Sequence, residues 1–208
     1  MSKEKQQTSG KRGRPKGSSN GGARALTKPE LSRLLAVARS KSLRDYALIS
    51  FMVGTGARVS EPLTLSIADV WVGGKVVDDV ALDLHQTKSR KSRRLVLSKS
   101  AQKALKEYIS AELEKGADVN RPLFTGHGAK RLNANYATQK IARLMSEAAI
   151  AGASSHSLRK TFAQTLLENC VSLVHIQKLL GHSSLSITQQ YLSSTDSDLR
   201  KAVATLNF

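Results

Sequence analysis

The sequence predicts a mainly α-helical chain with a small antiparallel β-sheet, an α+β fold, over residues 26–208. Two observations lead to this prediction. Apolar residues recur at helical spacing in several stretches, and a number of these stretches stop at a glycine. Three short runs, at residues 70–72, 75–84 and 93–97, instead have the composition of strands, and Gly73-Gly74 between the first two is typical of a hairpin turn.

Composition limits the chain to about one domain and favours an anionic partner. With 208 residues and 40% hydrophobic content, the chain can bury one good core, or one domain with a tail. The 33 Lys and Arg exceed the 16 Asp and Glu, and 33 − 16 gives a net charge of +17. Long-range attraction and counterion release make nucleic acid, and double-stranded DNA in particular, the expected partner of so basic a chain.

Neither a membrane nor a cofactor is expected. No apolar run approaches the roughly 20 residues of a spanning helix, and no signal-peptide pattern opens the chain, so we expect a cytoplasmic protein. Cys170 is the one cysteine, which excludes an internal disulfide, and its place at the end of an apolar stripe predicts a buried thiol. No residue pattern resembles a metal cluster.

Residues 1–25 are predicted to form a disordered basic arm, because they contain seven Lys or Arg, one Glu and almost no apolar residues. Within this arm, K-R-G-R-P-K-G at residues 11–17 resembles an AT-hook, whose Arg-Pro core lies extended in the narrow minor groove of A·T-rich DNA. Arg12, Arg14 and Lys16 are therefore candidate DNA-binding residues, since a narrow groove concentrates negative potential. The alternative is an unspecific basic tail.

The folded part is expected to begin with a helix over residues 27–40, where T-K-P-E forms a capping box with a proline in the first turn. A second helix, over residues 42–53, ends at a glycine turn. Arg58 stands where this turn enters a short helix, a place suited to holding phosphate through two hydrogen bonds, and Glu61 would orient it. Dinucleotide-binding and P-loop motifs are excluded, because the third glycine of the first and the Lys-Ser or Lys-Thr pair of the second are absent.

A basic turn is predicted between the second and third strands. Residues 86–93 read Q-T-K-S-R-K-S-R and contain no acid. Arg90, Lys91 and Arg93 are candidate DNA-binding residues that would contact the DNA backbone, and the alternative is a solvated basic turn. Lys88 has these cations as neighbours, which should ease its deprotonation.

Two amphipathic helices are predicted over residues 100–115 and 133–151, stopped by Gly116 and Gly152. The connection between these helices is expected to be a surface loop. Both helices are expected to serve the structure of the domain. Residues 196–208 predict a further short helix at the C-terminal end of the sequence.

The helix predicted over residues 154–171 carries an arginine inside its apolar stripe. Arg159 and His156 fall on the apolar side, while Ser157 and Thr161 fall on the polar side. An unpaired guanidinium there would be costly, so Arg159 needs an anionic partner, and the N-terminus of a helix favours phosphate. The alternatives are an internal ion pair with a carboxylate for Arg159, and a capping or core role for His156.

A shorter helix is predicted over residues 172–180, ended by Gly181 in the left-handed conformation, with His182 directly after it. Tyr191 follows nine residues after His182 and would end another short helix that begins at Ser184. The break between these helices matters, because one straight helix would place His182 and Tyr191 on opposite faces. Taken alone, Tyr191 would be a half-buried packing residue.

The polar residues of these segments form a family pattern. H-S-L-R at residues 156–159, L-G-H at residues 180–182 and the tyrosine nine residues later resemble the tyrosine recombinase, or phage integrase, family. T-G-A-R-V-S-E-P-L-T-L at residues 55–65 resembles the first-arginine motif of this family, and the lysine in the basic turn matches its catalytic lysine. The resemblance spans nearly all of the folded chain and implies six catalytic residues: Arg58, Lys88, His156, Arg159, His182 and Tyr191.

The resemblance implies a site-specific DNA recombinase or integrase, encoded by a bacterium, a phage or another mobile genetic element. The tyrosine of such an enzyme attacks a DNA phosphodiester and keeps the bond energy in a 3′-phosphotyrosyl intermediate, so no metal or nucleotide cofactor is needed. Arg58 and Arg159 would neutralise the phosphate. His156 and His182 would hydrogen-bond it and manage protons, and Lys88 would protonate the leaving 5′-hydroxyl. A homotetramer on DNA, accessory DNA-bending or directionality factors and association with the nucleoid are also implied.

The chain departs from the family pattern at the N-terminus. Most family members carry there a separate helical domain that completes a clamp around DNA, whereas this chain has the basic arm. One alternative is a DNA-binding regulator on a retained recombinase fold, although the intact set of six residues argues against it. The other alternative is a topoisomerase-like enzyme that relaxes DNA by the same chemistry without bringing two sites together.

Overall fold

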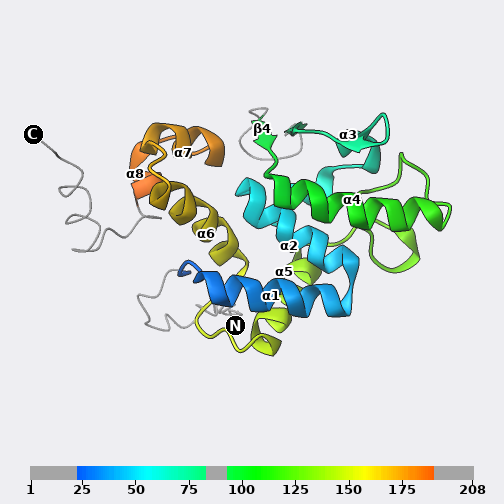
Figure 1. Cartoon of the computed structure of the whole chain (residues 1–208), viewed down its shortest axis with the longest axis horizontal. Coiled ribbons are helices and arrows are strands. Elements are labelled where there is room, and N and C mark those ends of the chain that lie inside the picture. Colours follow the sequence, from blue (N-terminus) through cyan, green and yellow to red (C-terminus); the bar gives the residue numbers. More distant parts are fainter. Residues whose placement is uncertain (1–22, 83–92, 190–208) are drawn as a thin grey trace, which may run out of the picture.

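The computed structural model describes residues 23–82 and 93–189, and this part of the chain is mainly helical with short antiparallel strands, as predicted (Figure 1). Its α-helices are α1 (Lys28–Lys41), α2 (Leu43–Thr55), α3 (Ile67–Val70), α4 (Lys99–Glu114), α5 (Ala134–Glu147), α6 (Ser155–Glu168), α7 (Leu173–Leu180) and α8 (Leu185–Gln189). Two 3-10 turns, η1 (Pro62–Thr64) and η2 (His127–Ala129), lie in the connections. The strands are β1 (Trp71–Val72), β2 (Lys75–Val76), β3 (Asp79–Leu82) and β4 (Arg93–Val96).

Helix α2 lies at the centre of the described part and packs against α1, α4 and α6 (Figure 1). Every residue from Ala47 to Met52 is buried, as expected for a helix that is apolar on nearly all sides. The helix ends at Thr55, and Gly56 follows in the left-handed conformation with φ 67°. The chain therefore leaves α2 in the interior of the molecule, directly before Arg58.

Helix α6 joins two hydrophobic cores. Leu158, near its N-terminal end, belongs to the large core that α1, α2, α4 and α5 share. Ala163, one turn further on, packs with Ile176 and Leu180 in a smaller core formed by α6 and α7. Because the larger core holds the first turns of α6, the smaller core fixes α7 relative to the rest of the molecule.

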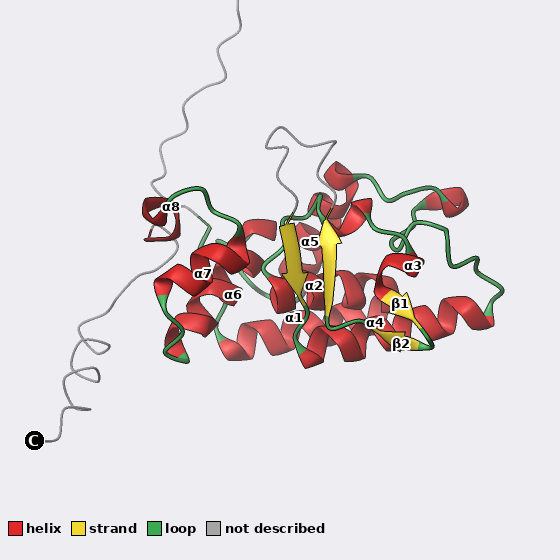
Figure 2. Cartoon of the chain, turned by 90° about the horizontal axis from the view of Figure 1, so that it is seen from above, coloured by secondary structure: helices red, strands yellow, loops and turns green. Residues whose placement is uncertain are grey.

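The predicted strand over residues 75–84 is wrong as one continuous strand. It is divided into β2 and β3 at residues 77–78, and the strands form two separate two-stranded sheets, β1–β2 and β3–β4, both antiparallel. Figure 2 shows the longer β3–β4 pair above α2, while β1 and β2 lie apart from it beside α3. The division coincides with a change of hydrogen-bond partner. The backbone N–H of Val77 still donates to the Val70 carbonyl, next to β1, whereas the Asp78 carbonyl accepts from the N–H of Leu97, directly after β4.

Several helix boundaries and burial predictions also change. Helix α5 ends at Glu147 rather than near residue 151, because Ala149 adopts a left-handed φ of 54°. Cys170, predicted to be buried, is exposed, since α6 has ended at Glu168 and Cys170 itself has a φ of 59°. Ser157 and Thr161, predicted on the polar face, are buried because α6 is covered on that side as well.

The covering on that side comes from the chain just before α1. The backbone N–H of Leu26 donates to Thr161 Oγ1 at 2.8 Å, and the Arg24 guanidinium donates to the Ala151 carbonyl and to Glu30. The predicted capping box of Thr27 and Glu30 is confirmed. The predicted arm thus meets the folded part against α6, although residues 1–22 of the arm and the predicted helix at residues 196–208 lie outside the described residues.

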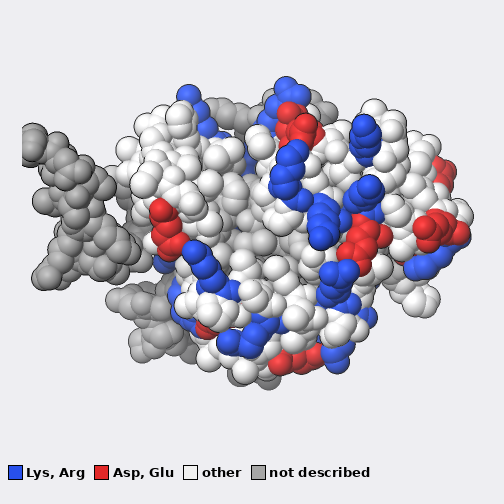
Figure 3. All heavy atoms as spheres, viewed as in Figure 1, with Lys and Arg blue, Asp and Glu red and all other residues white. Residues whose placement is uncertain are grey.

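The surface seen in Figure 3 carries acidic side chains interspersed among basic ones. Ion pairs account for part of this pattern, among them Arg39–Glu107, Arg94–Asp79 and Lys99–Asp78. Acidic side chains therefore interrupt the basic surface on this face. Within the described residues, no helix combines the length and the apolar character needed to cross a membrane.

Candidate active site

The left-handed turn after α2 brings three segments of the chain into contact. A Cβ atom on Gly56 would lie 2.5 Å from Phe162 of α6 and 2.9 Å from Leu180 of α7. These distances are shorter than any real carbon contact, and the positive φ would add strain, so this position requires glycine. The close approach places the end of α2 directly against α6 and the end of α7.

Arg159 crosses this junction. It lies in the second turn of α6, its side chain is buried with 1% of the residue exposed, and the prediction that it points into the interior is confirmed. Nη1 donates to the Gly56 carbonyl at 2.6 Å and Nη2 donates to the Leu180 carbonyl at 2.5 Å. Main-chain carbonyls at the ends of α2 and α7 are thus partners of this guanidinium, which joins both helix ends to α6.

Arg58 is oriented by Glu61, as predicted. The backbone N–H of Arg58 donates to Glu61 Oε2 at 2.6 Å, and Nη1 donates to Oε1 at 3.2 Å. The Glu61 side chain is buried, whereas the Arg58 side chain is 47% exposed. Glu61 therefore orients the Arg58 guanidinium, which remains accessible to a ligand from solvent.

His182 follows the left-handed residue Gly181, whose φ is 64°, so the predicted end of α7 is confirmed. Its ring is buried, with Nδ1 2.9 Å from Thr188 Oγ1 of α8. Burial lowers the pKa of His182 to about 4, with further lowering by the charges of Arg159, Arg58 and Arg93. The imidazole is consequently neutral near pH 7 in the protein without DNA.

His156 lies in the first turn of α6, three residues before Arg159, but the two side chains differ in burial. The residue is exposed, so the prediction that it lies in the apolar stripe is wrong. Ser155 is buried instead. Because His156 is exposed and the N-cap of α6 is Ser154, His156 has neither the core role nor the capping role that was the alternative for it.

Arg93 is also placed differently from the prediction. As a candidate DNA-binding residue in a solvated turn it should be exposed, but its side chain is only 8% exposed. Arg93 is the first residue of β4, and its side chain shares a face with Leu95 and Leu97, both buried. The alternation along the strand was the signal that the sequence offered for this burial.

The structure therefore brings together three of the predicted catalytic residues, Arg58, Arg159 and His182, and adds Glu61 and Arg93 to them. His156 lies on the same helix as Arg159. The remaining predicted site residues lie outside the described part of the chain: Arg12, Arg14, Lys16, Lys88, Arg90, Lys91 and Tyr191.

Comparison with known proteins identifies the family of the chain. The model of the phage integrase family matches residues 24–198. Tyrosine recombinase XerC from Neisseria meningitidis serogroup C is 36% identical over 155 residues, which cover 72% of this chain and 47% of the relative. Tyrosine recombinase XerD from Corynebacterium glutamicum is 32% identical over 169 residues, covering 79% of this chain and 53% of the relative. The chain thus spans about half the length of these relatives.

Solved structures show the same fold. The crystal structure of XerA recombinase superposes with a TM-score of 0.73 at 31% identity, and the match covers 88% of this chain and 65% of that one. XerH site-specific recombinase, bound to a palindromic difH substrate after cleavage, gives a TM-score of 0.69 at 24% identity and covers 86% and 52%. The chain belongs to the phage integrase family, and its fold is that of a tyrosine recombinase catalytic domain.

Proposed function

We propose that this chain cleaves and rejoins DNA strands at specific sites through a covalent 3′-phosphotyrosyl intermediate. The observation that carries the proposal is the convergence of Arg58, Arg159 and His182 from three separate segments around the turn after α2. The carboxylate that pairs with arginines of this cluster in the described ranges is Glu61, which contacts Arg58 and Arg93. A cluster with more guanidinium than carboxylate charge is suited to an incoming phosphate, and it would stabilise charge that grows on the phosphate oxygens.

Each residue has a distinct part in the proposed reaction. Tyr191 gives its phenolic proton to one of the two histidines and attacks the phosphorus, the bond to the 5′-oxygen breaks, and Lys88 gives that oxygen a proton. Arg58 and Arg159 bind the non-bridging oxygens, and His156 and neutral His182 hydrogen-bond the same phosphate. A free 5′-hydroxyl then attacks the phosphotyrosyl bond and restores a phosphodiester and the tyrosine. The energy of the broken bond is kept in the protein–DNA bond, so the reaction draws on no cofactor.

The assembly and location of the protein belong to the same proposal. Crossing two DNA partners requires four cleavages, so the chain would act as a homotetramer on DNA, with accessory DNA-bending or directionality factors. Several family structures are complexes with DNA, including a lambda integrase dimer on a core site. The protein would work in the cytoplasm, on the nucleoid or on a mobile element there.

One assay tests the proposal against its alternatives. The protein is incubated with supercoiled DNA carrying two copies of a candidate site, and covalent adducts, relaxed circles and recombinant circles are scored on one gel. We expect adducts and recombinants. Relaxation without recombinants would instead identify a topoisomerase-like enzyme, and tight binding without adducts would identify a DNA-binding regulator.

Lys88→Ala should slow cleavage of ordinary DNA by about a hundredfold or more, because the 5′-oxygen then leaves without its proton donor. A substrate with sulfur at the 5′-bridging position should restore most of the rate, since a thiolate leaves without a proton. Single-turnover adduct formation on both substrates measures the effect.

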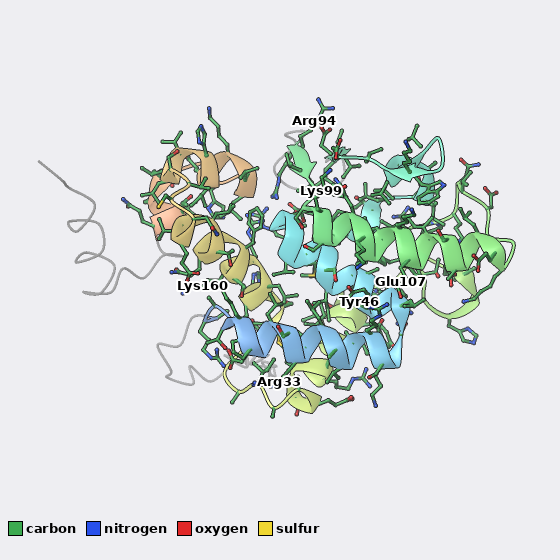
Figure 4. All side chains as sticks on the ribbon, in the orientation of Figure 1. Arg33, Tyr46, Arg94, Lys99, Glu107 and Lys160 are labelled. Atoms are coloured by element: carbon green, nitrogen blue, oxygen red, sulfur yellow. The ribbon has the colours of Figure 1, made fainter. Side chains whose placement is uncertain are left out.

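The matched control for this variant is Lys99→Ala. Lys99, labelled in Figure 4, is an exposed lysine that pairs with Asp78, and its loss should leave both rates unchanged. Equal slowing of Lys88→Ala on the two substrates would rule out the proton-donor role.

Deletion of residues 1–22 should weaken DNA binding without altering the chemical step. Ending the deletion there keeps Arg24, which anchors the chain to Glu30 and Ala151. The deletion removes six Lys or Arg and Glu4, a net charge of 6 − 1 = +5. If the six cations meet phosphates, the log–log salt dependence of binding should flatten by about five units, as measured by titration at several salt concentrations.

If the deleted segment contains an AT-hook, the loss of affinity should also depend on the DNA sequence that flanks the site. Affinity should then fall more on sites flanked by A·T tracts than on sites flanked by G·C, because Arg12 and Arg14 would enter a narrow minor groove. Arg14→Ala with Pro15→Ala should reproduce most of this loss of A·T preference while removing one charge. An equal loss on both flanks would reduce the arm to an unspecific tether.

A further inference from the structure

Arg93 lies at the beginning of β4, where its guanidinium is buried between two parts of the candidate site. Nη1 donates to Glu61 Oε1 at 3.1 Å and to the Leu180 carbonyl at 2.7 Å. Glu61 comes from the segment after α2, and Leu180 is the last residue of α7. The β4 strand thus reaches both segments through one nitrogen atom.

On the Glu61 side, Arg93 and Arg58 share one carboxylate oxygen. Arg58 Nη1 donates to the same Oε1 at 3.2 Å, while the Arg58 backbone N–H occupies Oε2. Both oxygens of Glu61 are therefore engaged, and the side chain cannot rotate without losing one of these bonds. Arg93 thereby restrains the carboxylate that orients Arg58.

On the α7 side, Arg93 and Arg159 share the Leu180 carbonyl, which accepts from Arg159 Nη2 at 2.5 Å. The aliphatic part of Arg93 also lies against the next residue, because a Cβ atom on Gly181 would be 2.8 Å from Arg93 Cδ. His182 follows Gly181 directly. The turn that carries His182 is consequently held by a hydrogen bond and by direct packing from the same arginine.

Burying the charge of Arg93 beside Arg58 and Arg159 lowers the stability of the fold. Burial lowers the pKa of Arg93, and the charge of Arg58 lowers it further against the opposing effect of Glu61. Nε and Nη2 of Arg93 have no hydrogen-bond partner among the described residues. A residue that served stability alone would be better replaced by an apolar side chain of similar length, since a buried charge is costly to solvate.

We propose that Arg93 is a positioning residue for strand cleavage, which fixes Arg58 and His182 relative to one another by joining the Glu61 carboxylate to the Leu180 carbonyl. This inference rests on the proposed function, because it assigns Arg93 to the same reaction. It replaces the DNA-backbone contact that the sequence suggested for Arg93. The guanidinium acts through Glu61 and the α7 turn, whereas Arg58 and His182 contact the phosphate.

The next residue in the chain provides a matched control. Arg94 carries the same charge, but its side chain is 74% exposed, pairs with Asp79 on β3 and extends outward from β4 (Figure 4). Arg93→Gln and Arg94→Gln therefore remove equal charge at neighbouring positions of one strand. Only the first disturbs the contacts with Glu61 and Leu180.

The kinetic test measures the rate of covalent adduct formation at saturating DNA, per mole of folded protein. Arg93→Gln should lower this rate at least about tenfold, because small displacements of catalytic groups reduce rates strongly, while DNA affinity stays within about twofold. Arg94→Gln should stay within about twofold of the wild type in both measurements. Equal rates for the two variants would overturn the inference.

Arg93→Lys separates geometry from charge and guards against a glutamine variant that folds poorly. Lysine keeps the positive charge, but its flexible ammonium lacks the rigid planar group that holds Nη1 of Arg93 between Glu61 and Leu180. We expect its rate to remain within about threefold of that of Arg93→Gln. A rate equal to the wild type would mean that charge alone is required, which contradicts positioning.

A titration of the protein without DNA provides a readout that does not depend on activity. The ring protons of His182, identified by their loss in His182→Asn, are followed by NMR against pH. Arg159 of α6, Arg58 after α2 and Arg93 of β4 face this ring with their charges, and Thr188 of α8 contacts it. Arg93→Gln should raise the pKa of His182 from its value of about 4, and Arg94→Gln should leave it unchanged.

These outcomes distinguish the two proposals. A wild-type protein that forms no adduct on any candidate site contradicts the proposed function. The contact of Arg93 with the His182 turn is then tested by the titration alone. A wild-type protein that forms adducts, with Arg93→Gln equally active or with His182 titrating unchanged, contradicts the inference alone.

Discussion

Tyr191→Phe should form no covalent adduct with DNA while it folds and binds DNA like the wild type. The substitution removes only the phenolic oxygen, which is the proposed nucleophile, and a phenyl ring has no other group able to attack phosphorus. Its ordinary pKa of about 10 means that the oxygen needs a cationic surrounding to react, and Arg58 and Arg159 would supply it. Denaturing gel electrophoresis of the protein–DNA mixture detects the adduct, and thermal unfolding reports the fold.

The control is Tyr136→Phe, which removes the same hydroxyl from a tyrosine that is exposed on α5. It should form adducts at the wild-type rate. Adducts that persist in Tyr191→Phe would move the nucleophile to another residue.

Arg159→Ala should lower the rate of adduct formation at least about a hundredfold and also destabilise the protein. The first effect follows from loss of a charge beside the phosphate, and the second from loss of the bonds to the Gly56 and Leu180 carbonyls. A buried carbonyl without a donor, together with the cavity left by the side chain, should lower the free energy of unfolding by about 2–4 kcal/mol. Urea denaturation and single-turnover cleavage measure the two effects separately.

Arg58→Ala is the matched comparison. Its side chain is half exposed, so its loss should reduce the free energy of unfolding by less than about 1 kcal/mol while it reduces cleavage as strongly. If Arg159→Ala loses activity only in proportion to its folded fraction, Arg159 is a structural residue. Cleavage by Arg58→Ala at the wild-type rate would remove Arg58 from the site.

The parts of the site that the sequence predicted are those with local signals. The capping box at Thr27, the left-handed Gly181 and the pair Arg58–Glu61 each depend on residues within four positions of one another, and the structure contains all of them. The burial of Arg159 was predictable because helical periodicity places it on the apolar stripe.

The parts that the sequence did not predict depend on distant main-chain groups. The Leu180 carbonyl accepts hydrogen bonds from Arg159 and Arg93, and no side-chain pattern encodes which carbonyl an arginine will reach. The run of basic residues predicts a DNA contact for Arg93, although the alternation along the strand indicates burial. A run of basic residues describes the segment as a whole, whereas the burial of each side chain depends on which face of the strand it occupies.

The divided strand and the exposed Cys170 have another origin. The strand is divided where hydrogen bonding changes from Val70 to Leu97, a residue far along the chain. Cys170 is exposed because α6 ends before it and its own φ is positive, a conformation that apolar periodicity does not indicate.

The anchoring of the chain before α1 to α6 bears on the order of folding. Leu26 and Thr161 are 135 positions apart, and Gly56 and Arg159 are 103 apart, yet each pair is joined by a hydrogen bond. Contacts of such long range close late in folding, because the intervening chain must first be ordered. The contact of Arg159 with Gly56 is one of them, so the candidate site is completed only when α6 has docked against the end of α2.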